Sequence, residues 1–294
     1  MFEVAEKKTN YFPFIESDPA AGAAELKSQL QENSYLFFRS LVPAKVILQV
    51  RQAVLEICLT AGWIDPNSNL MEAIVAPGVQ PTQEGKSDYA NVYRKVLQLP
   101  IFHNFPNDLN LVRIAASLLD INSQEVLVHP RRIGRLTFPN NKGATTPPHQ
   151  DFYYIRGSVD TLSCWTPLGE CPVELGGLAI MPGSHRGGYI EHTAEFPGAV
   201  GGVGIPVDES QATWHTTDFG LGDALFFHSH SIHKAMPNLT SNVLRISTDN
   251  RYQRPQDKIE PDALLPHGVA YMDSDNSGAK KRNRVYRPEH PKLP

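Results

Sequence analysis

The sequence predicts an α+β fold that is mainly β, with helices flanking a double-stranded β-helix, the jelly roll of cupin-like proteins. Two observations support this class. Roughly the first 120 residues carry apolar side chains at helical spacing, whereas from Arg131 onward short strands alternate with Gly and Pro turns. The 294 residues are expected to form a single domain, with a helical part over about 1–120, a jelly-roll core over about 124–252 and a C-terminal extension over 253–294.

The N-terminal part is expected to place helices on the outside of a sheet. Apolar residues recur at helical intervals over residues 21–60, interrupted by a buried strand at 34–40, and a further helix is expected at 109–119. Residues 65–86 are rich in Pro, Gly, Asn, Ser and Gln, so we expect a mobile loop that closes over bound substrate. A strand at 124–129 then leads into the core.

The core is expected to consist of short antiparallel strands. Their predicted positions are residues 135–138, 152–155, 162–168, 178–182, 223–228 and 244–249. Many short strands without intervening helices are typical of a sandwich or barrel, and the double-sheet jelly roll is the form that hosts metal sites between its sheets.

Composition argues against several classes of function. A net charge of −4 without a long basic stripe argues against a nucleic-acid partner. No apolar run is long enough to cross a bilayer and residues 1–8 lack the order of a signal peptide, so we expect no membrane partner and a cytoplasmic location. The three cysteines lack C-x-x-C spacing and predict neither a disulfide framework nor a structural zinc site. The basic run at 280–284 is expected to be a solvated extension.

A metal motif is suggested by His149-Gln150-Asp151 together with a distant histidine. Two histidines and one carboxylate form the facial triad of iron(II) oxygenases, and residues i and i+2 of a strand point to the same face. The triplet alone is weak, since it also occurs by chance as a polar pair at a strand end. Three histidines compete for the third ligand position within the segment that follows Gly222: His228, His230 and His233.

An arginine on the next expected strand strengthens this interpretation. Arg245 follows a Pro-Asn turn and can bind a carboxylate through two parallel hydrogen bonds, as a lysine cannot. The structural alternative is that Arg245 pairs with Asp223 or Asp249 on a neighbouring strand and supports only the fold.

These motifs, with Cys164-Trp165-Thr166-Pro167-Leu168 and the run from Gly176 to Arg186, resemble the phytanoyl-CoA dioxygenase family of iron(II)- and 2-oxoglutarate-dependent oxygenases over roughly residues 26–252. The resemblance implies three iron ligands and favours the last of the three competing histidines. It also implies contacts with 2-oxoglutarate. The residues that carry these roles are His149, Asp151 and His233 for the metal and Arg245, Trp165 and Lys95 for 2-oxoglutarate, with Arg135 near another such position.

The resemblance implies an enzyme that uses Fe(2+), 2-oxoglutarate and O2 to oxidise an unactivated C–H bond and releases succinate and CO2. Hydroxylation is the default, and demethylation, desaturation and ring formation stay open. We expect a small-molecule substrate, a natural-product intermediate, and the carboxylate of Asp151 disfavours a halogenase. The alternatives are a metal-binding jelly roll without oxygenase activity or a zinc hydrolase, neither of which needs Arg245 beside the metal.

Other polar and aromatic residues carry weaker expectations. The ring of His185 is expected to satisfy backbone groups, Trp63 to anchor the core, and Trp214-His215 to be an exposed loop feature. Some of the residues after the motif are expected to line the substrate pocket: Tyr153, Tyr154 and Arg156.

Overall fold

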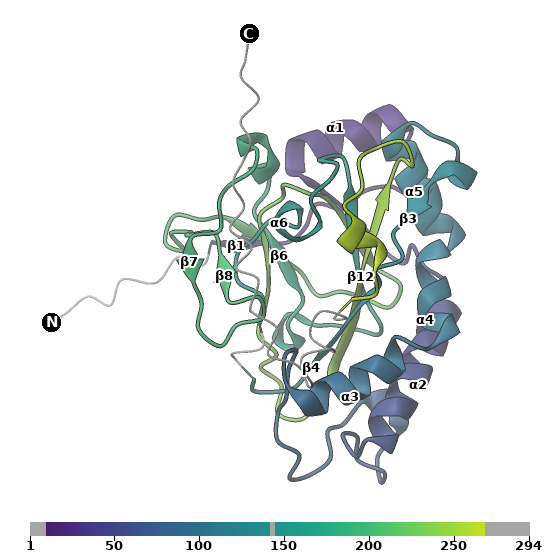
Figure 1. The fold of residues 1–294 in the computed structure, drawn as a ribbon, viewed down its shortest axis with the longest axis vertical. Coiled ribbons are helices and arrows are strands. Elements are labelled where there is room, and N and C mark those ends of the chain that lie inside the picture. Colours follow the sequence, from purple (N-terminus) through teal and green to yellow (C-terminus); the bar gives the residue numbers. More distant parts are fainter. Residues whose placement is uncertain (1–9, 142–144, 268–294) are drawn as a thin grey trace, which may run out of the picture.

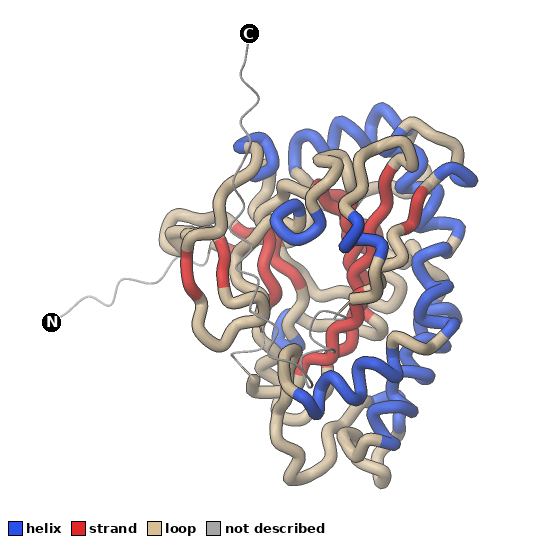
Figure 2. Tube along the Cα trace, in the orientation of Figure 1, coloured by secondary structure: helices blue, strands red, loops and turns tan. Residues whose placement is uncertain are grey.

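A computed structural model describes residues 10–141 and 145–267. Its strands form two groups that face each other, and helices cover the outer side of the larger group (Figures 1 and 2). The predicted double-sheet jelly roll with flanking N-terminal helices is confirmed. The basic run at 280–284 lies outside the described residues.

Five helices precede the core. They are α1 (Ala23–Asn33), α2 (Ala44–Thr60), α3 (Ser87–Val96), α4 (Pro100–Asn104) and α5 (Leu109–Leu119), and short 3-10 turns lie at Leu70–Glu72, Phe105–Asn107 and Ser123–Glu125. The helix predicted at 109–119 is confirmed at both ends. Asp108 accepts the Asn110 N–H at its start, and Asp120 in the left-handed region ends it. In the described residues no helix is long and apolar enough to span a bilayer.

The larger sheet has six strands. In spatial order they are β2 (Tyr35–Phe38), β10 (Ala224–His228), β5 (Leu162–Pro167) and β12 (Arg245–Gln253), whose far edge pairs with both β3 (Leu127–Val128) and β4 (Ile133–Thr137). All of these pairings are antiparallel.

The smaller sheet lies opposite. Its order is β1 (Tyr11–Phe12), β9 (Trp214–His215), β6 (Leu178–Ile180) and β11 (His233–Ala235), and β7 (Ala194–Glu195) pairs separately with β8 (Val203–Gly204). Trp214 is fully buried within this sheet, so the expectation of an exposed loop feature was wrong. Pairing with β1 and β6 draws its ring into a small apolar cluster with Ala179 and Ile205.

The main core lies between the helices and the outer face of the larger sheet. Trp63 is buried in it, as expected, and the three cysteines are free and buried. Strand β12 divides two environments, because alternate residues of a strand point to opposite faces. Ile246 and Tyr252 enter this core, whereas Arg245, Asp249 and Arg251 line a cavity between the sheets.

Strand β4 lies at the edge of the sheet, where backbone groups would lack partners. Two tyrosines one helical turn apart on α3 satisfy them: the hydroxyl of Tyr89 accepts the Leu136 N–H at 3.2 Å, and that of Tyr93 accepts the Gly134 N–H at 3.1 Å. A Cβ at Gly134 would lie 3.2 Å from the ring of Phe102, so a larger residue here would require this ring to shift. Helix α3 therefore covers the β4 edge of the larger sheet and satisfies two of its backbone N–H groups.

Two local predictions were wrong. Residues 152–155 form the helical turn α6 (Phe152–Ile155) and not a strand, because the Ile155 N–H bonds to the Asp151 carbonyl and Arg156, at φ +50°, ends the turn. The aromatic composition suits a strand, yet one turn lets Phe152 pack on His230 while Tyr153 stacks on His192. Asp151 therefore lies at the start of a helical turn and does not share a strand with His149.

The loop expected at 65–86 is ordered in its first half. Ala73 is fully buried, the Asp65 N–H bonds to the Ile74 carbonyl, and the Val75 N–H bonds to the Asn242 carbonyl. Half-buried Arg51 adds bonds from its guanidinium to the Met71 carbonyl. In the described part of the chain, no backbone hydrogen bond joins residues 77–86 to either sheet.

Candidate metal centre

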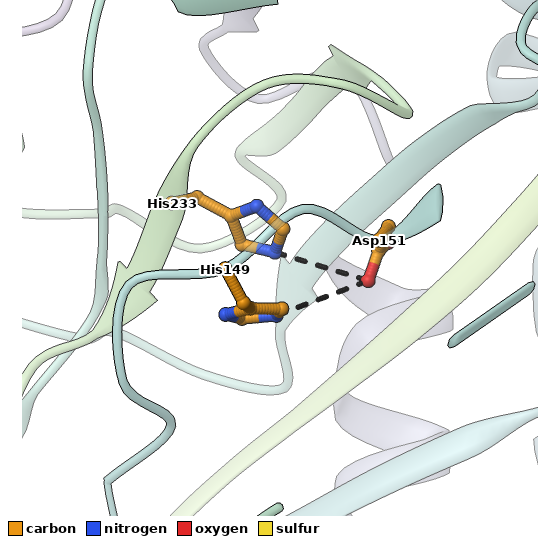
Figure 3. Close-up of side chains that lie close together, drawn as sticks. All are labelled: His149, Asp151 and His233. Carbon is orange, nitrogen blue, oxygen red and sulfur yellow. Dashed lines mark ion pairs between the residues drawn. The ribbon is translucent and has the colours of Figure 1, made fainter. Parts of the chain in front are cut away.

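The three residues of the predicted triad meet between the two sheets, although they come from different elements. His149 and His233 exchange backbone hydrogen bonds of 2.9 and 3.0 Å across an isolated antiparallel bridge, which brings their rings to 4.0 Å between centroids. Asp151 reaches them from the start of α6, with Oδ1 3.9 Å from Nε2 of each imidazole (Figure 3). This is the single group of three ligand-type side chains close enough to hold an ion in the part of the chain that the structure describes.

The protonation state of both imidazoles suits a metal. Nδ1 of His149 lies 2.7 Å from the Pro147 carbonyl and Nδ1 of His233 lies 2.9 Å from the Ser231 carbonyl. A carbonyl only accepts, so each Nδ1 carries the hydrogen and each Nε2 presents its lone pair. Burial lowers the pKa of His233, and burial together with the neighbouring His233 lowers the pKa of His149 well below its ordinary value.

Asp151 supplies the negative charge. Burial alone would raise its pKa, but the Arg251 guanidinium, the two imidazoles and the Ser163 hydroxyl together hold the pKa of this carboxyl well below its usual range. Two neutral imidazoles and one ionised carboxylate are the donor set of non-haem iron(II) oxygenases. The side chains present therefore fit an iron(II) ion.

Both polar and apolar side chains line the cavity that contains the triad. The cavity volume is about 40 Å³, and two residues for which the resemblance implied contact with 2-oxoglutarate, Trp165 and Arg245, line it. Lys95 does not: it lies exposed on α3. The face of α3 that meets the cavity carries Tyr89, so the structure gives no support to the 2-oxoglutarate contact implied for Lys95.

Arg245 is a buried cation without a carboxylate partner among the described residues. Its side chain donates from Nη1 to the Ser247 hydroxyl at 2.7 Å and from Nη2 to the Thr137 hydroxyl at 2.8 Å, and Nε has no partner. Burial lowers its pKa. The alternative ion pair of Arg245 with Asp223 or Asp249 is not formed. Asp223 pairs with Arg39, and Asp249 pairs with Arg135.

Three cavity residues were not assigned to the site from the sequence: Glu84, Asp249 and Arg251. Arg135 forms ion pairs with Glu84 and with Asp249, the latter at 3.4 Å, and Arg251 contacts Asp151. The sequence could have identified two of them. If Arg245 faces the site, the alternation of side chains along a strand places Asp249 and Arg251 on the same face. Glu84 comes from the 77–86 segment, and no periodic pattern pointed to it.

The competing histidines lie elsewhere. His228 and His230 pack with His185, at ring-centroid distances of 5.1 Å from His185 to His228 and 5.4 Å from His228 to His230. The expectation for His185 was wrong: both of its ring nitrogens are buried without a hydrogen-bond partner among the described residues. Its ring packs on an imidazole instead.

The aromatic residues after the motif lie beside the triad. The Tyr154 ring is 5.6 Å from that of His149 in an edge-on arrangement, and Tyr153 stacks on His192 at 4.0 Å. The cavity lining itself does not include Tyr153, Tyr154 or Arg156.

A jelly roll with this donor set and an inward-facing arginine defines the class, a non-haem iron(II)- and 2-oxoglutarate-dependent oxygenase. The model of the phytanoyl-CoA dioxygenase (PhyH) family matches residues 30–247. The chain belongs to this family, and the resemblance found in the sequence is confirmed.

Curated relatives agree with this assignment, and solved structures agree with the fold. The chain is 26% identical over 262 residues to 1-deoxypentalenic acid 11-beta-hydroxylase of Streptomyces exfoliatus, covering 83% of this chain and 85% of that one. It is 26% identical over 231 residues to human peroxisomal phytanoyl-CoA dioxygenase, covering 74% and 64%. The fold is similar to that of the epimerase SnoN from nogalamycin biosynthesis, with a TM-score of 0.57 and 18% identity over 89% of this chain and 93% of SnoN.

Proposed function

We propose that the protein uses iron(II), 2-oxoglutarate and O2 to oxidise an unactivated C–H bond of a small metabolite, with release of succinate and CO2. Hydroxylation is the default outcome. His149, Asp151 and His233 would hold the iron through the three ligand atoms that already face one another. When bound, iron(II) with 2-oxoglutarate and O2 supplies an oxidant strong enough to attack such a bond.

The observation that carries this proposal is the unpaired guanidinium of Arg245. A buried cation without a counter-ion is costly, so its presence in the cavity of the triad favours an anionic ligand. The distal carboxylate of 2-oxoglutarate suits it. The hydroxyls of Ser247 and Thr137 fix the guanidinium in place, and the Trp165 ring, 6.0 Å from its central carbon, forms an adjacent wall.

The experiment is an assay of succinate formation with each component omitted in turn. Succinate should appear only when iron(II), 2-oxoglutarate and O2 are all present, and a substrate should increase its rate. Activity that zinc restores without 2-oxoglutarate would instead establish the hydrolase alternative, and metal binding without any turnover across a broad substrate screen would leave a binding protein.

For the substrate we propose a small natural-product intermediate in preference to an acyl-CoA. The relative from Streptomyces exfoliatus is named as a hydroxylase of 1-deoxypentalenic acid, and SnoN is named as an epimerase from nogalamycin biosynthesis. Apolar side chains form part of the cavity wall: Leu136, Leu178, Val200 and Ala235. A screen of terpenoid and polyketide intermediates for coupled succinate release tests this choice, with acyl-CoA thioesters as the comparison. The fold does not choose the outcome, since an epimerase shares it. The cytoplasmic location stays a prediction.

A further inference from the structure

Two side chains outside the metal motif hold the carboxylate of Asp151. Ser163 on β5 donates its hydroxyl to Oδ2, and Nη2 of Arg251 on β12 donates to Oδ1 at 3.0 Å and to Oδ2 at 2.9 Å. All three side chains are buried, with 1% exposure for Ser163 and 4% each for Asp151 and Arg251. The two strands are neighbours in the larger sheet, where Arg251 pairs in register with Ser163.

The number of lone pairs on this carboxylate decides what remains for a metal. An ionised carboxylate offers about four acceptor positions, two on each oxygen. Ser163 and Arg251 take both positions on Oδ2, and Arg251 takes one on Oδ1. The remaining position belongs to Oδ1, the oxygen that lies 3.9 Å from Nε2 of both His149 and His233 (Figure 3).

We propose that Arg251 and Ser163 are positioning residues that present Asp151 to the metal through Oδ1 alone. This inference rests on the proposed function, because it assigns a role at the same metal centre. With Oδ2 engaged by the protein, the carboxylate takes one position on the ion and the others stay available to 2-oxoglutarate and O2. Without these two partners, the carboxylate is free to rotate, to chelate with both oxygens or to accept a hydrogen from an imidazole.

The hydrogen bonding of Arg251 argues against a purely structural role. Its Nε and Nη1 are buried without partners in the described residues, and its side-chain hydrogen bonds go to Asp151. Unsatisfied buried donors reduce stability. An arginine kept only for the fold would be expected to use its guanidinium on several acceptors, as half-buried Arg51 does with the carbonyls of Met71 and Leu168.

The charge of Arg251 and its positioning effect predict opposite changes in metal affinity. A positive guanidinium near the site repels a cation, so loss of its charge alone would tighten metal binding. Loss of positioning would weaken it, because the ligand oxygen is no longer held toward the imidazoles. The sign of the change in Arg251→Gln therefore identifies the dominant role.

The test is a titration of the metal-free protein with cobalt(II), which reports binding without turnover. Arg251→Gln should raise the cobalt Kd by about 10–100-fold. Ser163→Ala leaves every charge in place and should raise it by roughly twofold to tenfold, because the carboxylate loses one hydrogen bond but keeps both contacts with Arg251. Arg251→Lys keeps the charge without the planar fork and should fall between the parent and Arg251→Gln.

The matched control is Arg254→Gln, because Arg254 follows directly after β12 and does not line the cavity. Arg254 pairs with Asp257 at 3.1 Å and with Asp160, so its loss should lower thermal stability and leave the cobalt Kd unchanged. The visible absorption of bound cobalt gives a second readout, which should change in the Arg251 and Ser163 variants and not in this control.

A tighter cobalt Kd in Arg251→Gln would overturn the proposal in favour of a charge effect. So would parent-like Kd values and spectra in both Ser163→Ala and Arg251→Lys. These two variants decide the question if circular dichroism shows that Arg251→Gln does not fold. A parent protein that binds no cobalt would refute the metal centre of the proposed function itself, which is a separate outcome.

Discussion

Substitution of Arg245 tests the assignment of the cosubstrate most directly. In Arg245→Gln the cavity keeps its triad but loses the guanidinium, whose Nη1 and Nη2 donate to the hydroxyls of Ser247 and Thr137. A charge-assisted hydrogen bond to a carboxylate contributes about 1.5–3 kcal/mol in such a dry site. Loss of two such bonds amounts to about 3 kcal/mol or more, so the KM for 2-oxoglutarate should rise roughly a hundredfold or more.

The assay is succinate formation against 2-oxoglutarate concentration, with metal content measured in parallel. Activity should partly return at high 2-oxoglutarate, and Arg245→Lys should be intermediate because it keeps the charge without the fork. Arg39→Gln serves as the control, since Arg39 pairs with Glu16 and Asp223 and does not line the cavity. An unchanged KM with reduced thermal stability in Arg245→Gln would refute the reasoning and make Arg245 a structural residue.

Three further predictions follow from the same geometry. His149→Ala or Asp151→Ala should abolish iron binding and turnover, whereas His228→Ala should retain iron, and parent-like turnover in either triad variant would disprove the metal assignment. Residues 77–86 include Gln83 and Glu84, which line the cavity. A short Gly-Ser linker in place of this segment should preserve 2-oxoglutarate binding but uncouple succinate release from product formation. Equal coupling in the parent and the variant would show that the segment is passive. Burial, with His185 and His230 nearby, lowers the pKa of His228 to about 4. Between about pH 6.5 and 4 the imidazole of His228 therefore binds a proton in the unfolded chain but not in the folded one. The free energy of unfolding should fall by up to about 3 kcal/mol as the pH decreases through this range. Urea denaturation should show a weaker dependence of this free energy on pH in His228→Gln.

The sequence by itself determined the class of fold and the metal chemistry. Helical spacing and short strands between Gly and Pro turns report how each segment buries its own apolar face, which is local information, and most strands and the helix at 109–119 lie where they were expected. The ligand types were readable because a facial triad needs two imidazoles and a carboxylate, and few segments supply them together.

The tertiary structure decided which side chains share the site. His149 and His233 meet through a bridge between segments more than 80 residues apart, and the turn at α6, which its composition did not predict, carries Asp151. Ser163 and Glu84 could be placed only by the tertiary structure, because the pairing of β5 with β12 brings Ser163 to Asp151 and the 77–86 segment brings Glu84 to the cavity. Lys95 lies outside the cavity for the same kind of reason. A side chain's neighbours depend on the pairing and register of distant strands. The free energy that fixes this pairing comes from many contacts between residues far apart in the sequence, so no single stretch of sequence contains it.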